Sequence, residues 1–332
     1  MTDAAHRTPI VRLAPAKLNL TLALVGRRDD GFHDLHSVLV PLALHDILTV
    51  APAGTTGGDT LHVAGRDAGP LDDNLVLRAI SAARAAVGEG PGRPPTPPLA
   101  ARLEKRIPVA AGLGGGSSDA AAAIDAALDA WGATDALDPA RRQAVAASVG
   151  SDAPFFLAGG PALVEGRGDQ VTRLTGIRGH PGILLVTPAV AVRTPDVFAI
   201  FDGSHGAGGG DGSVRMTSAH LAQELGNGLS AADLVARAGV LASANDLLAS
   251  AALVAPGLVQ VRRALTRLLG RPIGLSGSGP TLWTLYPSLG EAEGAAVTVE
   301  NAIADGTVPS IGDGRASIIP TTIRTGQEGA ST

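Results

Sequence analysis

The stretch AAGLGGGSSDAAAA, at residues 110–123, constrains the fold more than any other part of the chain. Four glycines fall in five positions, two serines and an aspartate follow, and a run of alanines comes next. Glycine lets the backbone take left-handed conformations and approach a ligand closely, whereas alanine is the strongest helix former. The chain must therefore place a permissive loop directly before a helix.

The residues around this stretch complete a strand, a loop and a helix. LAARLEKRIPV, at residues 99–109, predicts the strand that leads into the glycines. Ser117, Ser118 and Asp119 suit the N-cap and first turn of the helix. The helix would carry one apolar stripe, formed by Ile124, Leu128 and Trp131. Gly132 suits its C-terminal end.

Such a loop and helix predict a cradle for phosphate groups, because a helix N-terminus offers unpaired backbone N–H groups and a partial positive charge. The P-loop pattern is excluded, since no lysine follows the glycines. The dinucleotide-binding pattern requires a different glycine spacing, although Asp135 or Asp138 could supply its acidic residue. A tight turn beside a closely packed alanine helix remains the alternative interpretation.

Strands and helices elsewhere predict an α+β protein with two lobes. We expect strands within 9–26, a hairpin over 47–65, further strands within 155–169 and 182–190, and a second glycine loop leading into a strand at 274–286. We expect helices at 72–88, 139–150 and 193–201, the last with Thr194 as its cap, and two or three more up to Leu269. Loops are expected at 88–98 and 203–213, the second a flexible insert, and a flexible tail at 311–332.

Composition excludes several classes of function. The net charge of −5 and the lack of a dense basic run argue against nucleic acid as a partner. There is no apolar leader and no run of about 18 apolar residues, so no membrane association is expected. The absence of cysteine excludes disulfides and suits a cytoplasmic protein. Only two of the 26 basic residues are lysines, Lys17 and Lys105. They are either accidental survivors of a bias towards arginine or are retained for their compact ammonium groups.

Four motifs together indicate a family. PVAAGLGGGSSDAA, at 108–121, resembles the P-x-x-x-G-L-[GS]-[GS]-S-[SA] motif of the galactokinase, homoserine kinase and mevalonate kinase (GHMP) superfamily. PAKLNLTLALVGRRDDGFHDLHSV, GSDAPFFLAGGPALVEGRG and GLSGSGPTLW resemble one branch of that superfamily, in order and spacing, over residues 10–290. That branch transfers the γ-phosphoryl group of ATP to the 2-hydroxyl of 4-diphosphocytidyl-2-C-methyl-D-erythritol, in the non-mevalonate (MEP) isoprenoid pathway.

The resemblance implies the two-lobed GHMP kinase fold. The N-terminal lobe, at 1–170, would resemble the second domain of ribosomal protein S5 and carry the glycine loop. The C-terminal lobe, at 171–310, would resemble a ferredoxin-like unit. The implied partners are ATP and a small-molecule substrate linked to cytidine diphosphate, and the oligomeric state stays open between monomer and homodimer.

The resemblance also implies the residues of an ATP site. These are Asn74, Lys105, Pro108, Val109, Ala110, Ala111, Gly112, Leu113, Gly114, Gly115, Gly116, Ser117 and Ser118. Mg²⁺ is expected together with ATP, held mainly by phosphates and water, with an oxygen from Ser117 or Ser118 as a candidate ligand. No pair of carboxylates indicates a dedicated metal site.

The implied catalytic pair is Lys17 and Asp152. Lys17 would bind the reacting groups, and Asp152 would accept the proton of the substrate hydroxyl. Asn19 would share the face of Lys17 on a strand and orient substrate or Asp152. The alternative interpretations are an exposed strand lysine and an ordinary turn aspartate.

The substrate end is expected to use Phe32 and Phe198 to stack on cytosine, with His33 reading the edge of the base. Thr194 would contact the base or only cap its helix. Core packing is the alternative for the phenylalanines, and a structural role is the alternative for His33. Two other functions stay open: another small-alcohol kinase of the superfamily, of homoserine or mevalonate type, and a non-catalytic ligand sensor.

Overall fold

A computed structural model describes residues 8–54, 57–67, 69, 73–88, 92, 94–206, 208–210 and 212–325. The chain forms two compact units, each built from separate segments. The first unit contains Met1–Ala16, Leu44–Val109 and Gly114–Leu157, and the second contains Lys17–Ala43, Ala110–Leu113 and Ala158–Thr332. Strands β1 (Ile10–Asn19) and β3 (His33–Pro52) contribute residues to both units. The lobes expected at 1–170 and 171–310 stay a prediction.

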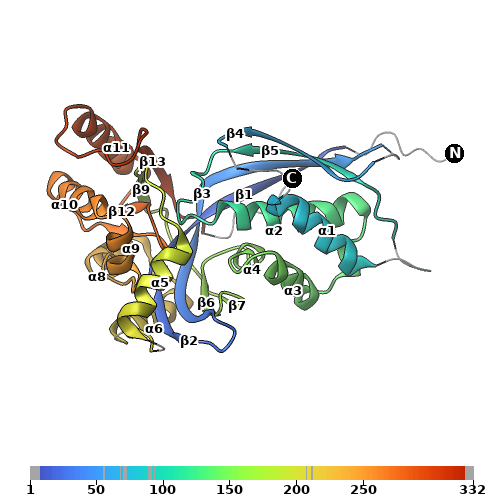
Figure 1. The fold of residues 1–332 in the computed structure, drawn as a ribbon, viewed down its shortest axis with the longest axis horizontal. Coiled ribbons are helices and arrows are strands. Elements are labelled where there is room, and N and C mark those ends of the chain that lie inside the picture. The colour runs from blue at the N-terminus through green and yellow to red at the C-terminus, as the bar shows by residue number, and fades with distance from the viewer. Residues whose placement is uncertain are drawn as a thin grey trace. The chain divides into compact units, whose positions relative to one another are not determined.

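The first unit is a small sheet covered by helices. Its remaining elements are β4 (Thr60–Gly65), α1 (Leu75–Val87), β5 (Leu99–Lys105), α2 (Gly115–Trp131), the 3₁₀ turn η2 (Thr134–Ala136), α3 (Pro139–Val149) and α4 (Ala153–Leu157). Helices α1 and α2 lie side by side against β3, β4 and β5 (Figure 1). The strand, loop and helix predicted over 99–131 are confirmed.

The hairpin expected over 47–65 is wrong, although both of its strands exist. β5 lies between them: it pairs antiparallel with β3 and parallel with β4, as Leu103 shows by facing Leu48 on one side and Val63 on the other. A parallel pair cannot be joined by a tight turn, so the chain crosses from β4 to β5 through α1.

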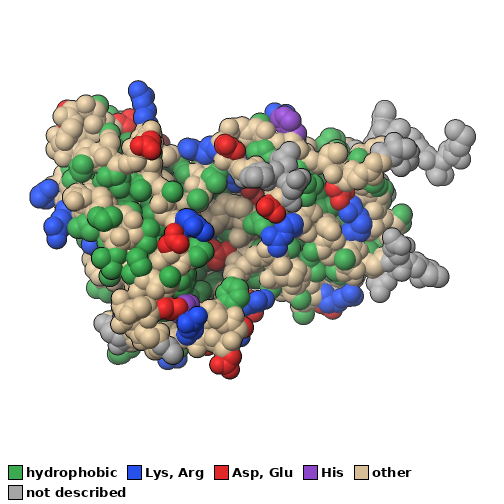
Figure 2. Space-filling view, viewed as in Figure 1, with side chains coloured by type: hydrophobic (Ala, Val, Ile, Leu, Met, Phe, Trp, Pro, Cys, Tyr) green, Lys and Arg blue, Asp and Glu red, His purple; other side chains and the backbone are tan. Residues whose placement is uncertain are grey.

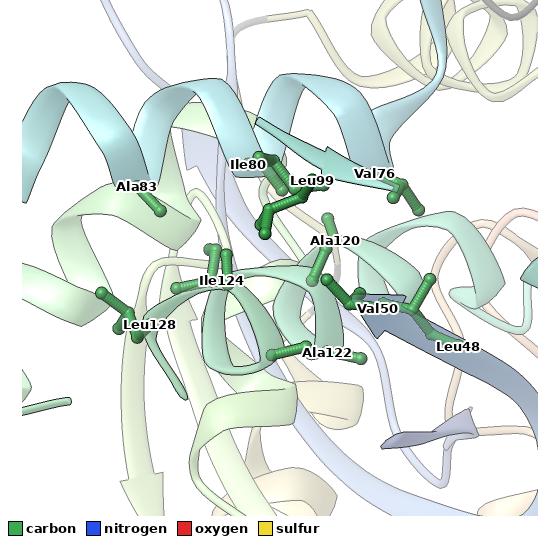
Figure 3. Packing of buried hydrophobic residues seen from close by; sticks show 14 of the residues in the cluster. Leu48, Val50, Val76, Ile80, Ala83, Leu99, Ala120, Ala122, Ile124 and Leu128 are labelled. Carbon is green, nitrogen blue, oxygen red and sulfur yellow. The ribbon is translucent and has the colours of Figure 1, made fainter. Parts of the chain in front are cut away.

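Alanines let the helices of the first unit pack closely. Ala120, Ile124 and Leu128 of α2 face Ile80 and Ala83 of α1, as Figure 3 shows. Leu48 and Val50 of β3, Val76 of α1, Leu99 of β5 and Ala122 of α2 complete the labelled part of this core. The predicted apolar stripe is confirmed, but the burial of α2 extends well beyond it, since even Ser118 and Asp119 are buried.

Two details of the first unit differ from expectation. The N-cap of α2 is Gly114, with a φ of 67°, rather than one of Ser117, Ser118 and Asp119. The helix begins earlier because this left-handed glycine redirects the chain and the next two glycines already take helical conformations. Residues 155–157, expected as strand, belong to α4, where Pro154 suits the first turn and Phe155 is buried.

The second unit contains a sheet in the order β11-β12-β9-β13. The strands that lie wholly within the second unit are β2 (Ala23–Arg27), β6 (Ala162–Gly166), β7 (Gln170–Arg173), β8 (Ile177–Arg178), β9 (Gly182–Thr187), β10 (Leu229–Ser230), β11 (Gly274–Leu275), β12 (Leu282–Tyr286) and β13 (Ser317–Thr322). Its helices are α5 (Thr194–His205), α6 (Ser213–Gly226), α7 (Ala231–Ala236), α8 (Ala238–Leu241), α9 (Leu248–Val254), α10 (Gly257–Leu269) and α11 (Leu289–Ala304). Helix α11 packs on β9, β12 and β13, while the first half of β3 pairs with β2 and β6.

Several expectations for the second unit are corrected. Helix α5 begins at Thr194 with Arg193 as its cap, so Thr194 is not the cap. Residues 203–205 continue α5, and Gly208 forms a bridge with Gly26, so this part of the expected insert is ordered. Residues 207 and 211 lie outside the described residues.

The region before Leu269 and the end of the chain also differ from expectation. More helices than the expected two or three precede Leu269, from α6 to α10. In the expected tail, residues 317–322 form β13, because the edge of β9 offers a partner for this β-branched stretch. Residues 326–332 of that tail lie outside the described residues.

Charged side chains of both signs are interspersed over the face shown in Figure 2. Within the part of the chain that the structure describes, no helix has both the length and the apolar character needed to span a bilayer.

Candidate active site

The glycine loop alternates between ordinary and left-handed backbone. Ala110, Gly112 and Gly114 have φ angles of 52°, 75° and 67°. Such alternation turns successive N–H groups towards one side, and a helix start leaves the N–H groups of its first turn without intrahelical acceptors. Gly115, Gly116 and Ser117 form that first turn of α2. The loop therefore has the backbone geometry of an anion cradle.

Lys105 lies beneath the start of α2, in a buried cluster of three charges. Its Nζ donates to Oδ2 of Asp119 at 2.7 Å and also pairs with Asp46. Asp46 in turn accepts from the backbone N–H groups of Arg106 and Ile107, at 2.5 and 2.8 Å. A Cβ on Gly115 would lie 3.2 Å from the Lys105 Nζ. Lys105 thus contacts the first two turns of α2, through Asp119 and close to Gly115.

The cluster perturbs two pKa values. Burial by itself lowers the pKa of Lys105, but the charges of Asp119 and Asp46 outweigh burial and raise that pKa. Burial raises the pKa of Asp119, and the charge of Asp46 adds to this shift, while Lys105 opposes it. Among the described residues, Asp119 Oδ1 and the neighbouring Ser118 Oγ have no hydrogen-bond partner although both are buried. The hydroxyl of Ser118 therefore has hydrogen-bonding capacity that no described residue uses.

The remaining predicted residues of the first unit have structural contacts as well. Asn74 is the N-cap of α1, where its Oδ1 accepts from the Val76 N–H at 3.0 Å. Asp152 lies in the turn before α4, and a Cβ on Gly150 in the same segment would lie 3.4 Å from the hydroxyl oxygen of Ser117. The segment that carries Asp152 is thus beside the start of α2.

In the second unit, the middle of the glycine loop packs against the second glycine loop, residues 276–281. Ser276 Oγ donates to the Gly112 carbonyl at 2.9 Å, and the Thr281 N–H donates to the Ala111 carbonyl at 3.4 Å. A Cβ on Gly112 would collide with the Ser276 carbonyl oxygen. Asn245 holds the second loop, since its amide donates to the carbonyls of Leu275 and Gly277.

Lys17 and Asn19 lie at this junction. The Lys17 N–H donates to the Leu113 carbonyl at 2.9 Å, and Lys17 Nζ donates to Asn19 Oδ1 at 2.5 Å. A Cβ on Gly277 would lie 3.4 Å from that Nζ. The expectation that Lys17 and Asn19 share one face of a strand is confirmed, and Lys17 is buried rather than an exposed strand lysine. Lys17 belongs to the second unit and Asp152 to the first, so their pairing stays a prediction.

Aromatic residues gather at the start of β3 in the second unit. The His33 ring lies 4.9 Å from the Phe198 ring, and His33 Nε2 bonds Asp202 Oδ1 at 2.6 Å. Because a carboxylate can only accept, Nε2 of His33 is the donor in this contact. Phe32 is half exposed, beneath the Arg167 guanidinium at 5.8 Å.

Thr194 Oγ1 is 2.8 Å from Ser278 Oγ, which ties α5 to the second glycine loop. Residues that the sequence reasoning did not single out are Ser37, Asp202, Asn245 and Ser276. Ser276 and Ser37 lie within two of the family motifs, but nothing in those motifs singles out either serine, and no local pattern marks Asp202 or Asn245.

Comparison with known proteins identifies the class. Residues 74–160 match the family described as the GHMP kinases N terminal domain. A homoserine kinase from Cytophaga hutchinsonii shares the fold at 16% identity, with a TM-score of 0.65 and 97% of each chain covered. The chain therefore has the fold of the GHMP kinases and carries their N-terminal domain.

Closer relatives identify the family. The 4-diphosphocytidyl-2-C-methyl-D-erythritol kinase of Pelotomaculum thermopropionicum is 36% identical, over 85% of this chain and 91% of the relative. That of Deinococcus radiodurans is 35% identical, over 88% and 90%. A crystal structure of 4-(cytidine 5'-diphospho)-2C-methyl-D-erythritol kinase matches with a TM-score of 0.67 at 30% identity, covering 95% of this chain and all of that one. The chain belongs to this family. It is therefore a kinase that acts on an alcohol group with ATP as donor.

Proposed function

We propose that this chain transfers the γ-phosphoryl group of ATP to the 2-hydroxyl of 4-diphosphocytidyl-2-C-methyl-D-erythritol, in the biosynthesis of isoprenoid precursors. The observation that carries the proposal is the junction in the second unit, where Gly112 of the phosphate loop, the second glycine loop, Lys17 and Asn19 meet. A phosphate-binding backbone next to a buried ammonium is the equipment that phosphoryl transfer needs, because this reaction depends on positioning and charge stabilisation.

In the proposed site, the N–H groups of Ala110 to Ser118 bind the phosphates of ATP. The left-handed residues of this loop turn the N–H groups towards the ligand, and the α2 N-terminus adds its partial positive charge. Pro108 and Val109 lead into the loop, Asn74 lies at the start of α1 for the adenosine end, and Lys105 supports α2.

Lys17 and Asp152 are the proposed catalytic residues. The Lys17 ammonium binds the substrate hydroxyl or the γ-phosphate and stabilises the charge of the transferring group. Asp152 accepts the proton that leaves the 2-hydroxyl. Asn19 fixes the Lys17 side chain through its Oδ1.

At the cytosine end, Phe32 and Phe198 are proposed to stack on the base, since a flat ring suits a flat base. With Nε2 of His33 donating to Asp202, the other ring nitrogen, Nδ1, is an acceptor when the ring is neutral. An acceptor there suits the exocyclic amino group of cytosine, which is a donor. Thr194 contacts substrate only if its bond to Ser278 is shared with the ligand.

Mg²⁺ is proposed to accompany ATP. Across the described residues no group of three acidic or histidine side chains is arranged to hold a metal ion. The unpartnered hydroxyl of Ser118, together with Ser117, fits an ion that phosphates and water hold for the most part. When bound, Mg²⁺ neutralises charge on the phosphates.

The family relatives favour this substrate over homoserine or mevalonate, since kinases of those alcohols that share the fold do so at only 11–17% identity. The presence of both Lys17 and Asp152 argues against a non-catalytic sensor. We further propose a cytoplasmic location and the lobes 1–170 and 171–310 for the N- and C-terminal parts of the kinase.

The test is a coupled assay with purified protein, ATP, Mg²⁺ and the cytidine-linked alcohol, run on wild type and on Asp152→Asn. We expect the variant to lose at least about 100-fold in kcat, because general-base catalysis commonly contributes that much. Asp135→Asn is the matched control, since it makes the same change at an exposed aspartate of the same unit. Turnover of Asp152→Asn at the wild-type rate would remove Asp152 from the mechanism. Wild type that phosphorylates homoserine or mevalonate but not the cytidine-linked alcohol would refute the proposed substrate.

A further inference from the structure

A buried chain of polar side chains continues from Lys17 into the interior of the second unit. Lys17 Nζ donates to Asn19 Oδ1 at 2.5 Å, and Asn19 Nδ2 donates to Ser37 Oγ at 2.9 Å. None of the three residues is more than 6% exposed. In such surroundings a misdirected polar atom is costly, so the direction of each hydrogen bond matters.

Ser37 can only act as an acceptor towards Asn19. A serine hydroxyl has a single hydrogen, and that of Ser37 is donated to the Thr21 carbonyl oxygen at 2.5 Å. The side of Ser37 Oγ that faces Asn19 therefore presents a lone pair. Only an N–H group is a favourable partner there.

This fixes the orientation of the Asn19 amide. With Nδ2 towards Ser37, the carbonyl oxygen Oδ1 must point the other way, towards the Lys17 ammonium. Rotating the amide by half a turn would place its NH₂ group against the ammonium and its oxygen against a lone pair of Ser37. Both contacts would be lost at once, inside a buried site where each unsatisfied polar group costs about 1–3 kcal/mol.

Thr21, whose carbonyl oxygen accepts the Ser37 hydroxyl hydrogen, is held in place by further hydrogen bonds. Thr21 lies between β1 and β2, and its hydroxyl accepts from the Val38 N–H at 3.0 Å and donates to Ser218 Oγ of α6 at 2.8 Å. Ser218 Oγ in turn lies 2.9 Å from His36 Nδ1. The Thr21 carbonyl is thus a fixed reference for the Ser37 hydroxyl.

We propose that Ser37 is a positioning residue of the kinase: it selects the amide orientation of Asn19 that presents an oxygen to Lys17. This inference rests on the roles proposed above for Lys17 and Asn19. Ser37 does not touch ATP or substrate in this assignment and acts only through Asn19.

The test is a double-mutant cycle in the coupled kinase assay with Ser37→Ala, Asn19→Ala and the double variant. We expect Ser37→Ala to lower kcat by about 10-fold or more, since small misplacements of reacting groups cost up to about 100-fold, with both KM values within about 3-fold of wild type. On the Asn19→Ala background the same substitution should change kcat by less than about 2-fold, because the two residues act as one unit. Ser37→Thr, which keeps the hydroxyl, should restore turnover.

Thr284→Val is the matched control, because it also deletes a buried hydroxyl of the second unit, one without a hydrogen-bond partner among the described residues. It should leave kcat unchanged. Wild-type kcat in Ser37→Ala, full additivity with Asn19→Ala, or failure of Ser37→Thr to restore turnover would each overturn the inference. Failure of the proposed function would appear instead in the wild-type enzyme, as no turnover of the cytidine-linked alcohol.

Discussion

Replacing Lys105 by methionine should destabilise the first unit strongly and in a pH-dependent way. The substitution keeps an unbranched apolar side chain but removes the ammonium that both Asp46 and Asp119 contact. Asp46 retains two backbone N–H donors, from Arg106 and Ile107. Asp119 loses its only hydrogen-bond donor among the described residues, since its Oδ1 already has none.

The expected magnitude follows from the burial of all three side chains, of which none is more than 4% exposed. Breaking a buried ion pair by removing one partner costs about 3–5 kcal/mol of unfolding free energy, whereas a surface pair contributes at most about 1 kcal/mol. The neighbouring variant Arg106→Met is therefore a matched control, because Arg106 pairs with Glu104 at the surface. We expect Lys105→Met to cost about 3–5 kcal/mol at pH 8 and Arg106→Met at most about 1 kcal/mol.

The pH dependence has a defined sign. Burial raises the pKa of Asp119 from 3.8 to about 7, so the folded wild type binds a proton that the unfolded chain has released. Stability therefore falls as the pH rises between these two values, by at most about 1.4 kcal/mol per pH unit, and levels off above the folded pKa. Without Lys105 the pKa of Asp119 rises further, so the variant should keep losing stability above pH 7. Adding Asp119→Asn should remove this extra dependence and recover part of the loss at pH 8.

The assay is urea unfolding followed by tryptophan fluorescence. The chain has two tryptophans, Trp131 in the first unit and Trp283 in the second. In a Trp283→Phe background the remaining tryptophan is Trp131, the last residue of α2. It is buried in the hydrophobic core of the first unit and reports the unfolding of that unit. A Lys105→Met deficit below about 1 kcal/mol at pH 8, the range of a surface pair, would refute the reasoning. A deficit that is equal at pH 6 and pH 8 would refute the part assigned to Asp119.

Two further predictions concern ligands. Phe32→Ala should raise the KM for the cytidine-linked substrate by about 10-fold or more, because stacking on a base is worth about 1–3 kcal/mol. The KM for ATP should be little changed in this variant, and Phe32→Tyr should leave both KM values little changed. An unaltered KM for the cytidine-linked substrate in Phe32→Ala would reject stacking. Gly112→Ala should lower kcat/KM for ATP by at least about 10-fold, since a Cβ there collides with the Ser276 carbonyl and the φ of 75° disfavours any side chain. Gly306→Ala, at a φ of 82° with open space around it, carries the backbone strain alone and should leave ATP kinetics unchanged; equal kinetic losses in both variants would contradict the assigned collision.

The elements predicted from the sequence are those with local signals. The strand, glycine loop and helix over 99–131 were predictable because turn-forming glycines, the C-terminal Gly132 and apolar periodicity all lie within one stretch, although the N-cap was placed too late. Helix α11 was not predicted, although Ser288 followed by Glu291, three residues later, is a capping box, and Ser288 does accept from the Glu291 N–H.

The choice of partners could not be predicted locally. Nothing between residues 47 and 65 indicates that β5 separates β3 from β4, because strand pairing is decided by the whole sheet. Likewise, the bond between Ser276 and Gly112 joins residues 164 positions apart. Lys17 was selected by its rarity and its motif. Ser37, which accepts a hydrogen bond from Asn19, lies within the same quoted motif, but its residue type and spacing carry no signal of its role.

The dependence of Gly112 on Ser276 has a consequence for biosynthesis. During synthesis, the phosphate loop leaves the ribosome long before Ser276, the residue that contacts Gly112. A long-range contact forms only once both of its partners have been synthesised. A nascent chain released before Thr281 would have α2 and its glycines but no surface to hold Ala111 and Gly112. Nucleotide binding should thus be acquired late, when nearly the whole polypeptide has been synthesised.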